Sequence, residues 1–390
     1  MTRKADKFDN WIRGAFVDLN TELEELYFST DNPMNVDGVG DEIKQQIFEQ
    51  GNAHIIELLD EGNTDEGFDG AFNLLGNLGL YFGALRRHEM TNPETEQTSP
   101  FVAASALGLQ IAASLGVAPR FASSHLESHN KAIKGKPKSF TWLPDEQLFN
   151  EYNTRGILCF KRAADALTRV LPLGVSHPVT GMLLEDAKDA LAKVITYNKA
   201  LFNQLDIDRF FFCVRPYYKS YRVGKSIYRG ANAGDISGIN QIDMLLGLCR
   251  ANDAYYSQIL VEKMLYMLPE DQASMRDCMR RVSLLDEFLA LADDCHNQPW
   301  FQENLTLFLQ VCDMHGATAQ QHHNLLVKKF VERPAKGLDS KFLKQLTASG
   351  PPLPKLMQSL TTLRDLRMAA KSTQTETRYN DIKRLRGLLG

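Results

Sequence analysis

Apolar residues recur every three or four positions along most of this chain, which is the period of a helix with one buried face. Residues 8–26 show the spacing clearly, and residues 41–59 and 65–88 continue it. The later segments with this period are residues 145–171, 181–203, 252–268, 271–293, 304–331 and 355–371. No segment sustains the alternation of apolar and polar residues that a half-buried strand requires. The pattern predicts an all-α fold.

A polar segment with two prolines, TNPETEQTSP at residues 91–100, interrupts the helical pattern. Its composition is typical of a link between folded parts. We therefore expect a small N-terminal helical domain over residues 1–98 and a large helical domain over residues 99–390. After the link, Ser99 is expected to cap, and Pro100 to open, an uncharged helix that is buried on all sides.

Length and composition are those of a globular protein: 390 residues, of which 44% are hydrophobic and 24% charged. The net charge of −4 and the lack of a basic stripe argue against a nucleic-acid partner. No stretch is apolar enough for a membrane span, and the start, MTRKADKFDNW, has no apolar signal core. The six cysteines include no CxxC motif, so we expect reduced cysteines in a cytoplasmic protein.

The helix predicted over residues 304–331 carries adjacent histidines, His322 and His323. At about 100° per residue, His323 falls within an apolar stripe, whereas His322 turns toward the polar face. The apolar residues beside His323 are Ala319, Leu326, Val327 and Phe330. A lone imidazole in an apolar wall is either a hydrogen-bonded core residue or a metal ligand, and one histidine is enough for a haem iron. The helix alone favours the core residue.

A second pair, His125 and His129, has the i, i+4 spacing that can bind a metal on a helix. Residues 123–144 are rich in glycine, proline and lysine, which predicts a loop. Glu127 follows His125 by two positions rather than one, so the zincin motif is absent. We expect no metal site here.

Aromatic residues crowd around one cation in the segment RFFFCVRPYYKSY, residues 209–221. The cation is Arg215, whose planar guanidinium can bind both oxygens of a carboxylate, and the rings can flank a flat apolar ligand. Composition alone slightly favours an aromatic core with a partly exposed arginine.

The segment GANAG at residues 230–234 is a small-residue loop that can approach a ligand closely. Asp235 follows it and is expected to cap a helix that begins at Ile236. Within that helix Asp243 shares a face with Leu246, so we expect this acid to be paired or hydrogen-bonded in the core.

The motifs FFFCVRPYY, IYRG, NAGDISGINQIDMLLGL, HNLLVKKFV and KLMQSL, in this order, resemble the indoleamine and tryptophan 2,3-dioxygenase superfamily. The likeness is greater to its bacterial branch that includes monodechloroaminopyrrolnitrin synthase, and it covers roughly residues 101–371. It implies an all-helical oxidoreductase that holds haem b through one histidine. It also implies a dioxygenase that adds O₂ across the C2–C3 bond of tryptophan or a related indole substrate.

The resemblance also implies a role for individual residues of this chain. His323 corresponds to the axial ligand of the haem iron, and Asp243 to an acid that supports the same side. Arg215 corresponds to the partner of the substrate carboxylate, with Phe210 and Phe211 as the aromatic wall. The residues that correspond to the opposite, distal side of the haem are Asn232, Ala233, Gly234 and Ser105.

This sequence departs from the family pattern at three places. The SAGQSS loop of the family is NAGDIS here, and an arginine that often precedes the axial histidine by one turn is Gln320. The haem propionates would therefore need other partners, such as Arg222, Lys225 or Arg229. The closing Gly-Gly-Thr loop is replaced by GPPLP at residues 350–354, which lacks the threonine hydroxyl.

These departures leave the reaction open. One alternative is a haem-dependent rearrangement of a modified tryptophan, as the bacterial branch implies. Others are a haem-binding sensor or carrier without turnover, and a helical interaction module without a cofactor. The polar, basic segment from residue 372 leaves open a homo-oligomer.

Overall fold

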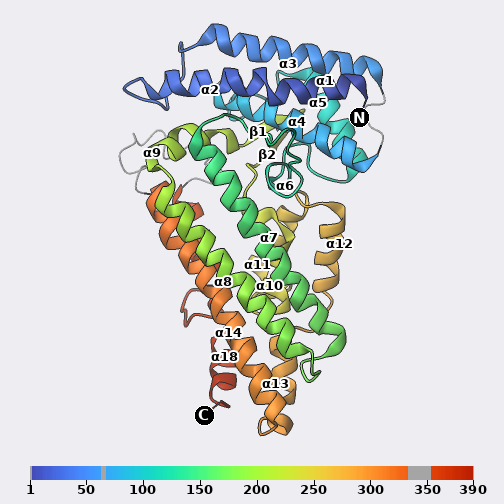
Figure 1. The fold of residues 1–390 in the computed structure, drawn as a ribbon, viewed down its shortest axis with the longest axis vertical. Coiled ribbons are helices and arrows are strands. Elements are labelled where there is room, and N and C mark those ends of the chain that lie inside the picture. Colours follow the sequence, from blue (N-terminus) through green and yellow to red (C-terminus); the bar gives the residue numbers. More distant parts are fainter. Residues whose placement is uncertain (1, 63–66, 333–352, 390) are drawn as a thin grey trace. The chain divides into compact units, whose positions relative to one another are not determined.

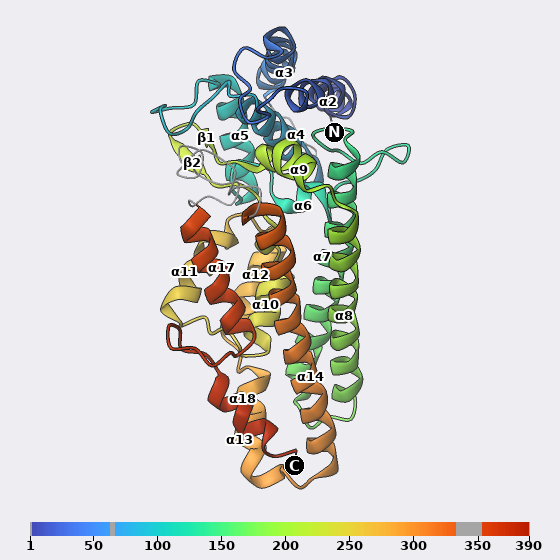
Figure 2. The same ribbon diagram turned by 90° about the vertical axis from the view of Figure 1, so that its left-hand side faces the viewer.

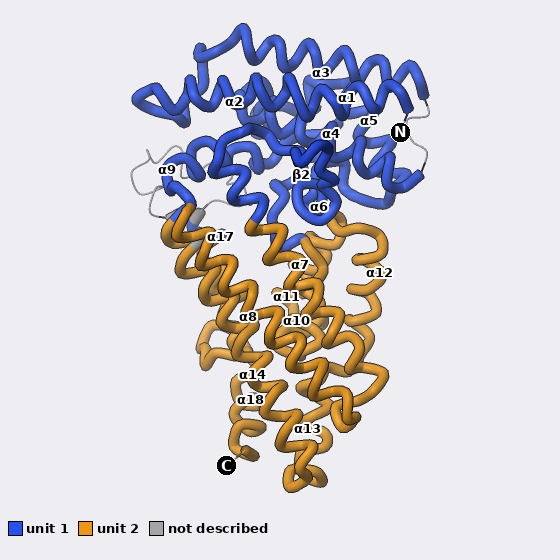
Figure 3. Tube along the Cα trace, viewed as in Figure 1, with its two compact units in different colours: residues 1–151, 205–235, 330–356 blue, residues 152–204, 236–329, 357–390 orange. Residues whose placement is uncertain are grey.

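The computed structural model describes residues 2–62, 67–332 and 353–389, which form helices and one two-stranded hairpin (Figure 1). This confirms the all-α fold class. Contacts divide the chain into two units: unit 1 comprises residues 1–151, 205–235 and 330–356, and unit 2 comprises residues 152–204, 236–329 and 357–390 (Figure 3). The boundary expected after residue 98 stays a prediction.

Unit 1 begins with six helices, of which α4 is the central one. They are α1 (Arg3–Arg13), α2 (Ala15–Phe28), α3 (Asp41–Glu61), α4 (Phe68–Arg87), α5 (Val102–Leu115) and α6 (Ser123–Leu126). The first predicted helix is in fact two, because Gly14 leaves the helical conformation with φ −124° and ψ −103°. Residues 74–87 of α4 are all buried, and this helix packs against α1, α3 and α5. It is the core of unit 1.

The glycines of α4 allow a close approach of other chain segments. A Cβ atom added at Gly79 would lie 2.2 Å from the backbone nitrogen of Phe121, and one at Gly76 would lie 2.6 Å from the His125 ring. The partner of Gly79 is the irregular chain just before α6.

Two expectations for α5 are wrong. The helix begins at Val102 with Phe101 as the N-cap, and the Ser99 hydroxyl accepts a hydrogen bond from the Phe101 N–H (3.3 Å). One face also remains open, since Val102 is 75% and Leu109 42% exposed. The uncharged helix therefore buries only one face, which includes Ala104, Leu107 and Ile111.

The remainder of unit 1 contains short elements: α9 (Ile207–Arg209), η1 (Phe210–Val214), η2 (Arg215–Tyr218), β1 (Tyr221–Val223), β2 (Ser226–Tyr228) and η3 (Ala233–Asp235). The strands pair antiparallel, with Tyr221 opposite Tyr228. Three residues are too few to show an alternating pattern, which explains why no strand was expected. The long helix α7 (Pro144–Leu173) contributes residues to both units.

Unit 2 is a helical bundle. Its helices are α8 (Thr180–Gln204), α10 (Ser237–Leu245), α11 (Ala254–Met264), α12 (Pro269–Cys278), α13 (Leu284–Cys295), α14 (Pro299–Gln321), α17 (Leu353–Arg367) and α18 (Tyr379–Arg386). Helices α8 and α14 lie side by side along their lengths (Figure 2). Their core includes Leu191, Phe301 and Phe308.

Two predicted helices of unit 2 differ from the structure. Residues 271–293 form parts of α12 and α13, and α14 gives way at His322 to the π-helix η4 (His322–Glu332). None of the described helices is both long and apolar enough to cross a membrane. All six cysteines are free, and four of them are buried.

Candidate functional site

Arg215 lies at the start of η2, directly after the aromatic turn η1. Its guanidinium carbon is 5.5 Å from the centre of the Phe211 ring, and the Phe211 and Phe212 rings meet edge to face at 5.0 Å. Phe210 contacts Phe149, with ring centres 4.9 Å apart. Phe210 and Phe211 are both buried, and Phe211 is the one of the two that contacts the arginine; their role as a wall for a substrate ring stays a prediction.

The Arg215 guanidinium makes no hydrogen bond or ion pair with the described residues. Burial lowers its pKa to about 10, and no carboxylate offsets this effect. A desolvated cation of this kind gains strongly from an incoming anion. The arrangement is therefore suited to binding a carboxylate with an aromatic body.

A buried ion pair positions the aromatic turn. Arg87 on α4 donates two hydrogen bonds to Glu24 on α2 (2.7 and 2.8 Å), and its Nη2 also donates to the Phe212 carbonyl (3.1 Å). Both side chains are almost completely buried. Sequence analysis did not identify this pair, because the two residues are 63 positions apart and no local spacing connects them.

The loop at residues 230–235 is closed by Asp235, which is 2% exposed. Its carboxylate pairs with Arg229 (2.5 and 3.0 Å) and accepts a hydrogen bond from the Asn232 N–H (3.1 Å). Helix α10 begins at Ser237 with Ile236 as the N-cap, so the expectation that Asp235 caps this helix is wrong. The acid instead fixes the loop that contains Asn232, Ala233 and Gly234.

The candidate propionate partners Arg222 and Arg229 are engaged elsewhere in unit 1. Arg222 donates to the carbonyls of Lys225 (2.5 Å) and Pro93 (2.9 Å), and Arg229 is held by Asp235. Binding a propionate would require each to exchange a partner, and their roles stay predictions.

Ser105 lies on α5 and is 5% exposed, and its hydroxyl has no partner among the described residues. A buried hydroxyl without a partner is unfavourable, so a ligand that supplied one would be stabilised. The distal position that the family resemblance implies for Ser105 stays a prediction.

Asp243 is fully buried in unit 2 and accepts hydrogen bonds from three side chains. The donors are Tyr256 Oη (2.8 Å), His315 Nε2 (2.6 Å) and Arg367 through Nε (2.9 Å) and Nη2 (2.8 Å). Burial opposes ionisation, but the Arg367 charge and these hydrogen bonds outweigh it and hold the pKa of Asp243 well below its usual range. The expectation that this acid is paired is confirmed.

His315 and Arg367 were not identified from the sequence. His315 is 72 and Arg367 is 124 positions from Asp243, so only the packing of α10, α14 and α17 brings them together. The arginine that the family often has one turn before the axial histidine is Gln320 here. Arg367 provides a buried cation from a different helix.

His323 is 4% exposed and contacts α17. Its Nε2 is 3.1 Å from the Thr361 hydroxyl, which donates its own proton to the Met357 carbonyl (2.9 Å). The other ring nitrogen, Nδ1, is 3.4 Å from the side-chain oxygen of Asn324. Burial lowers the pKa of His323.

Desolvation by the surrounding protein, together with the nearby charges of Arg367 and Lys263, lowers the pKa of His322 to about 4. The sequence-predicted candidates thus divide between the units: His323 and Asp243 belong to unit 2, and the remaining candidates belong to unit 1.

His125 has a structural role. Its Nδ1 accepts a hydrogen bond from the Ala122 N–H (2.8 Å), and its Nε2 bonds to the Phe72 carbonyl (2.9 Å). Both ring nitrogens are used, which leaves none for a metal and agrees with the expectation for this pair.

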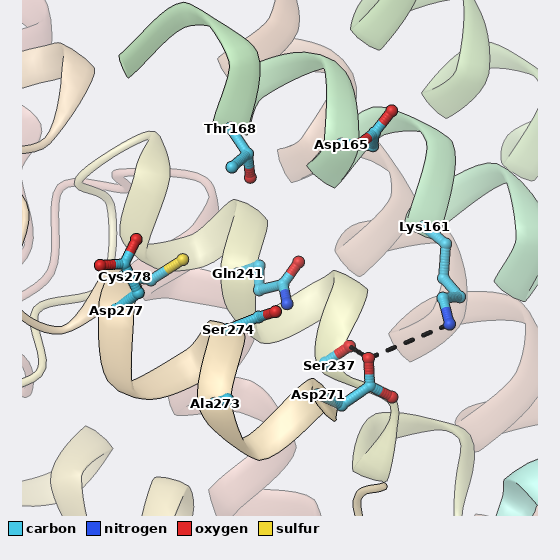
Figure 4. Close-up of a pocket in the computed structure, with 10 residues that line it drawn as sticks. All are labelled: Lys161, Asp165, Thr168, Ser237, Gln241, Asp271, Ala273, Ser274, Asp277 and Cys278. Carbon is cyan, nitrogen blue, oxygen red and sulfur yellow. Dashed lines mark hydrogen bonds and ion pairs between the residues drawn. The ribbon is translucent and has the colours of Figure 1, made fainter. Parts of the chain in front are cut away.

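A polar pocket of about 450 Å³ lies in unit 2 among residues of α7, α10 and α12 (Figure 4). Within it, the Ser237 hydroxyl donates to Asp271 (2.7 Å), and Lys161 lies 3.9 Å from the same carboxylate. None of the candidate residues predicted from the sequence lines this pocket. The segment GPPLP at residues 350–354 replaces the closing loop of the family. Its residues 350–352 lie outside the described part of the chain.

One comparison identifies a relationship across nearly the whole chain. A family model described as Monodechloroaminopyrrolnitrin synthase PrnB matches residues 2–389. No curated protein matches the chain.

Proposed function

The chain belongs to the monodechloroaminopyrrolnitrin synthase family, within the larger superfamily of indoleamine and tryptophan 2,3-dioxygenases, and from this premise we propose that it is a haem-dependent enzyme that modifies tryptophan or a related indole. One observation supports the proposal most. The desolvated guanidinium of Arg215 lies beside the Phe211 ring and has no carboxylate partner among the described residues. An indole acid supplies both an anion and a flat ring.

The residues present fit a haem. A haem iron requires only one imidazole from the protein, and unit 2 presents two histidines with lowered pKa values, His322 and His323. The family resemblance selects His323 as the ligand. When bound, haem would supply the iron that activates O₂.

The protein residues would bind and orient the substrate. Arg215 would hold the carboxylate, Phe210 and Phe211 would confine the ring, and the loop that contains Asn232 would limit access of water. The unpartnered hydroxyl of Ser105 would donate a hydrogen bond on the same side. In the leading reaction O₂ adds across the indole C2–C3 bond.

The second candidate is a rearrangement of a modified tryptophan without net dioxygenation. The family match is compatible with either reaction, so this candidate rests on the departures of the sequence from the dioxygenase pattern. The loop NAGDIS also replaces a hydroxyl with the amide of Asn232, which changes the hydrogen bonds offered to the substrate.

A haemin titration followed by product analysis tests the proposal. Purified protein is titrated with haemin and should develop a Soret band that saturates at one equivalent. The loaded protein is then incubated with tryptophan and substituted indoles under O₂, and product mass distinguishes dioxygenation from rearrangement. Absence of saturable haem binding would refute the haem enzyme, and a haem protein that converts none of these indoles would refute the substrate class.

A further inference from the structure

Lys219 ends the tight turn of unit 1 that begins with Arg215. The turn is η2, and the Lys219 N–H closes it by donating to the Pro216 carbonyl (3.3 Å). Both basic side chains are partly exposed, and neither forms a hydrogen bond or an ion pair with the described residues. Two basic groups that lack a partner among the described residues therefore lie one turn apart, next to the aromatic residues of η1.

Two consecutive arginines at the C-terminal end of α4 hold this segment in place. Arg87 Nη2 donates to the Phe212 carbonyl (3.1 Å), and Arg86 Nε donates to the Ser220 carbonyl (3.2 Å). Glu24 neutralises Arg87, whereas the hydrogen bonds of Arg86 to the described residues go to backbone carbonyls. The lysine side chain just before Ser220 is therefore surrounded by positive charge from α4 and η2.

Burial and nearby charges oppose a proton on the Lys219 amine. The opposing charges are those of Arg86, Arg87 and Arg215. Glu89 acts in the opposite direction, and the result is a pKa lowered to about 7. At pH 7 about half of these amines are neutral, against fewer than about one in 10³ for an ordinary lysine with a pKa near 10.4. A desolvated, neutral lysine beside other cations is a nucleophile toward carbonyl groups.

The two basic groups and the rings together define a class of ligand. The Arg215 guanidinium suits a carboxylate, and the Phe211 ring beside it suits an aromatic body. The Lys219 amine, one turn away, suits a carbonyl carbon. A 2-oxo acid has its keto carbon bonded directly to its carboxylate carbon, so it offers both groups side by side. An amino acid has no carbonyl group with which this lysine could react in the same way.

We propose that Lys219 is a covalent binding site for an aromatic 2-oxo acid, which it holds as a reversible imine while Arg215 binds the carboxylate. The amine nitrogen adds to the keto carbon, and the two amine protons leave with the keto oxygen as water. The C=N bond forms without an oxidant or a reductant. The bound acid occupies the guanidinium assigned to the indole substrate, so the two ligands compete. The imine needs no haem, and the inference goes beyond the proposed function.

Reductive trapping tests the covalent site. The full-length protein is incubated at pH 7 with indole-3-pyruvate and cyanoborohydride, which reduces the imine to a stable secondary amine, and peptide mass spectrometry locates the adduct. We expect the main adduct on Lys219 and its loss in Lys219→Met, which removes a desolvated charge and should remain folded. Lys225→Met is the matched control, because Lys225 is exposed nearby, and it should be labelled like wild type. Labelling spread over the exposed lysines, or undiminished in Lys219→Met, would overturn the proposal.

A second probe tests the carboxylate. Indole-3-acetaldehyde has the ring and a carbonyl group but no carboxylate. In Arg215→Ala the labelling of Lys219 by indole-3-pyruvate should fall about tenfold or more relative to labelling by the aldehyde, the scale of a lost hydrogen bond to a charged group. An unchanged ratio of the two labels would refute the role of Arg215 in holding the 2-oxo acid. Trapping is measured without haem, so its failure is distinguishable from a failure of the proposed function.

Discussion

The guanidinium of Arg215 combines a charge with an apolar setting that does not stabilise it. The described residues around it contribute rings and other cations, and no carboxylate bonds to it. Such a position is unfavourable in the free protein and becomes favourable when an anion binds. It is the residue whose removal should most affect the recognition of an acidic ligand.

Replacing Arg215 with alanine should raise the KM for an indole carboxylate by up to about 10²-fold, since a hydrogen bond to a charged group contributes roughly 1.5–3 kcal/mol. Steady-state kinetics on haem-loaded protein provides the measurement. Arg215→Lys keeps the charge without the planar fork and should be intermediate. An unchanged KM in Arg215→Ala would exclude this role.

Lys219 provides a prediction about pH. Burial lowers its pKa to about 7, and the charges of Arg86, Arg87 and Arg215 add to this, while Glu89 acts in the opposite direction. Because the folded pKa is below the unfolded value near 10.4, the charged form favours unfolding. The resulting loss in the free energy of unfolding is fully present below pH 7 and declines as the pH rises toward 10.

Lys219→Met should therefore raise the Tm relative to wild type at pH 7, and by less at pH 10. Calorimetry on both proteins at both pH values measures the difference. A gain of equal size at the two pH values would show that the charge of Lys219 is not responsible.

Individual helices follow from the sequence where a long apolar period fixes them. Helix α3 spans Asp41–Glu61, against an expected range of 41–59, because its inward residues are spaced without interruption. The observed helix boundaries differ from the expected ones where the local backbone conformation ends a helix, as Gly14 does between α1 and α2. The π-helix after α14 has no distinct apolar period over so few residues, so an α-helix was the natural expectation.

The packing of α4 depends on one glycine in particular. Gly79→Ala should destabilise the protein by about 1–3 kcal/mol, the usual range for overpacking, because the new methyl group would meet the backbone of Phe121. Gly108→Ala is the control, since its Cβ would lie 3.1 Å from the flexible Leu78 side chain. Chemical denaturation measures the free energy of unfolding of the two variants. Equal losses relative to wild type would show that contact with the Phe121 backbone is not the cause.

Across the whole molecule, the sequence predicted the fold class and the family, but not the partners of its buried charges. Asp243 was expected to be paired, yet Arg367 could not be chosen among the 44 lysines and arginines of the chain. Nothing in the sequence indicated that Glu24 and Arg87 would form an ion pair. Contacts between residues this far apart depend on how the helices pack, which a helical period does not specify.

The Glu24–Arg87 pair should be essential to unit 1. Glu24→Gln leaves the buried Arg87 charge without its carboxylate and should cost about 3–5 kcal/mol in the free energy of unfolding. The double variant Glu24→Leu, Arg87→Met should lose less of the free energy of unfolding than Glu24→Gln does, because neither side chain is then charged. Urea unfolding of the single and double variants measures both values. A double variant less stable than Glu24→Gln would contradict this account.

The distance in sequence between Asp243 and Arg367 also sets an order of events during synthesis. The acid is translated 124 residues before its arginine, an interval of roughly 6–25 s at about 5–20 residues per second. Throughout that time the nascent bundle has a carboxylate at its centre without its main counter-ion. Unit 2 can therefore reach its final packing only after α17 has been synthesised, because this helix carries the counter-ion of its buried acid.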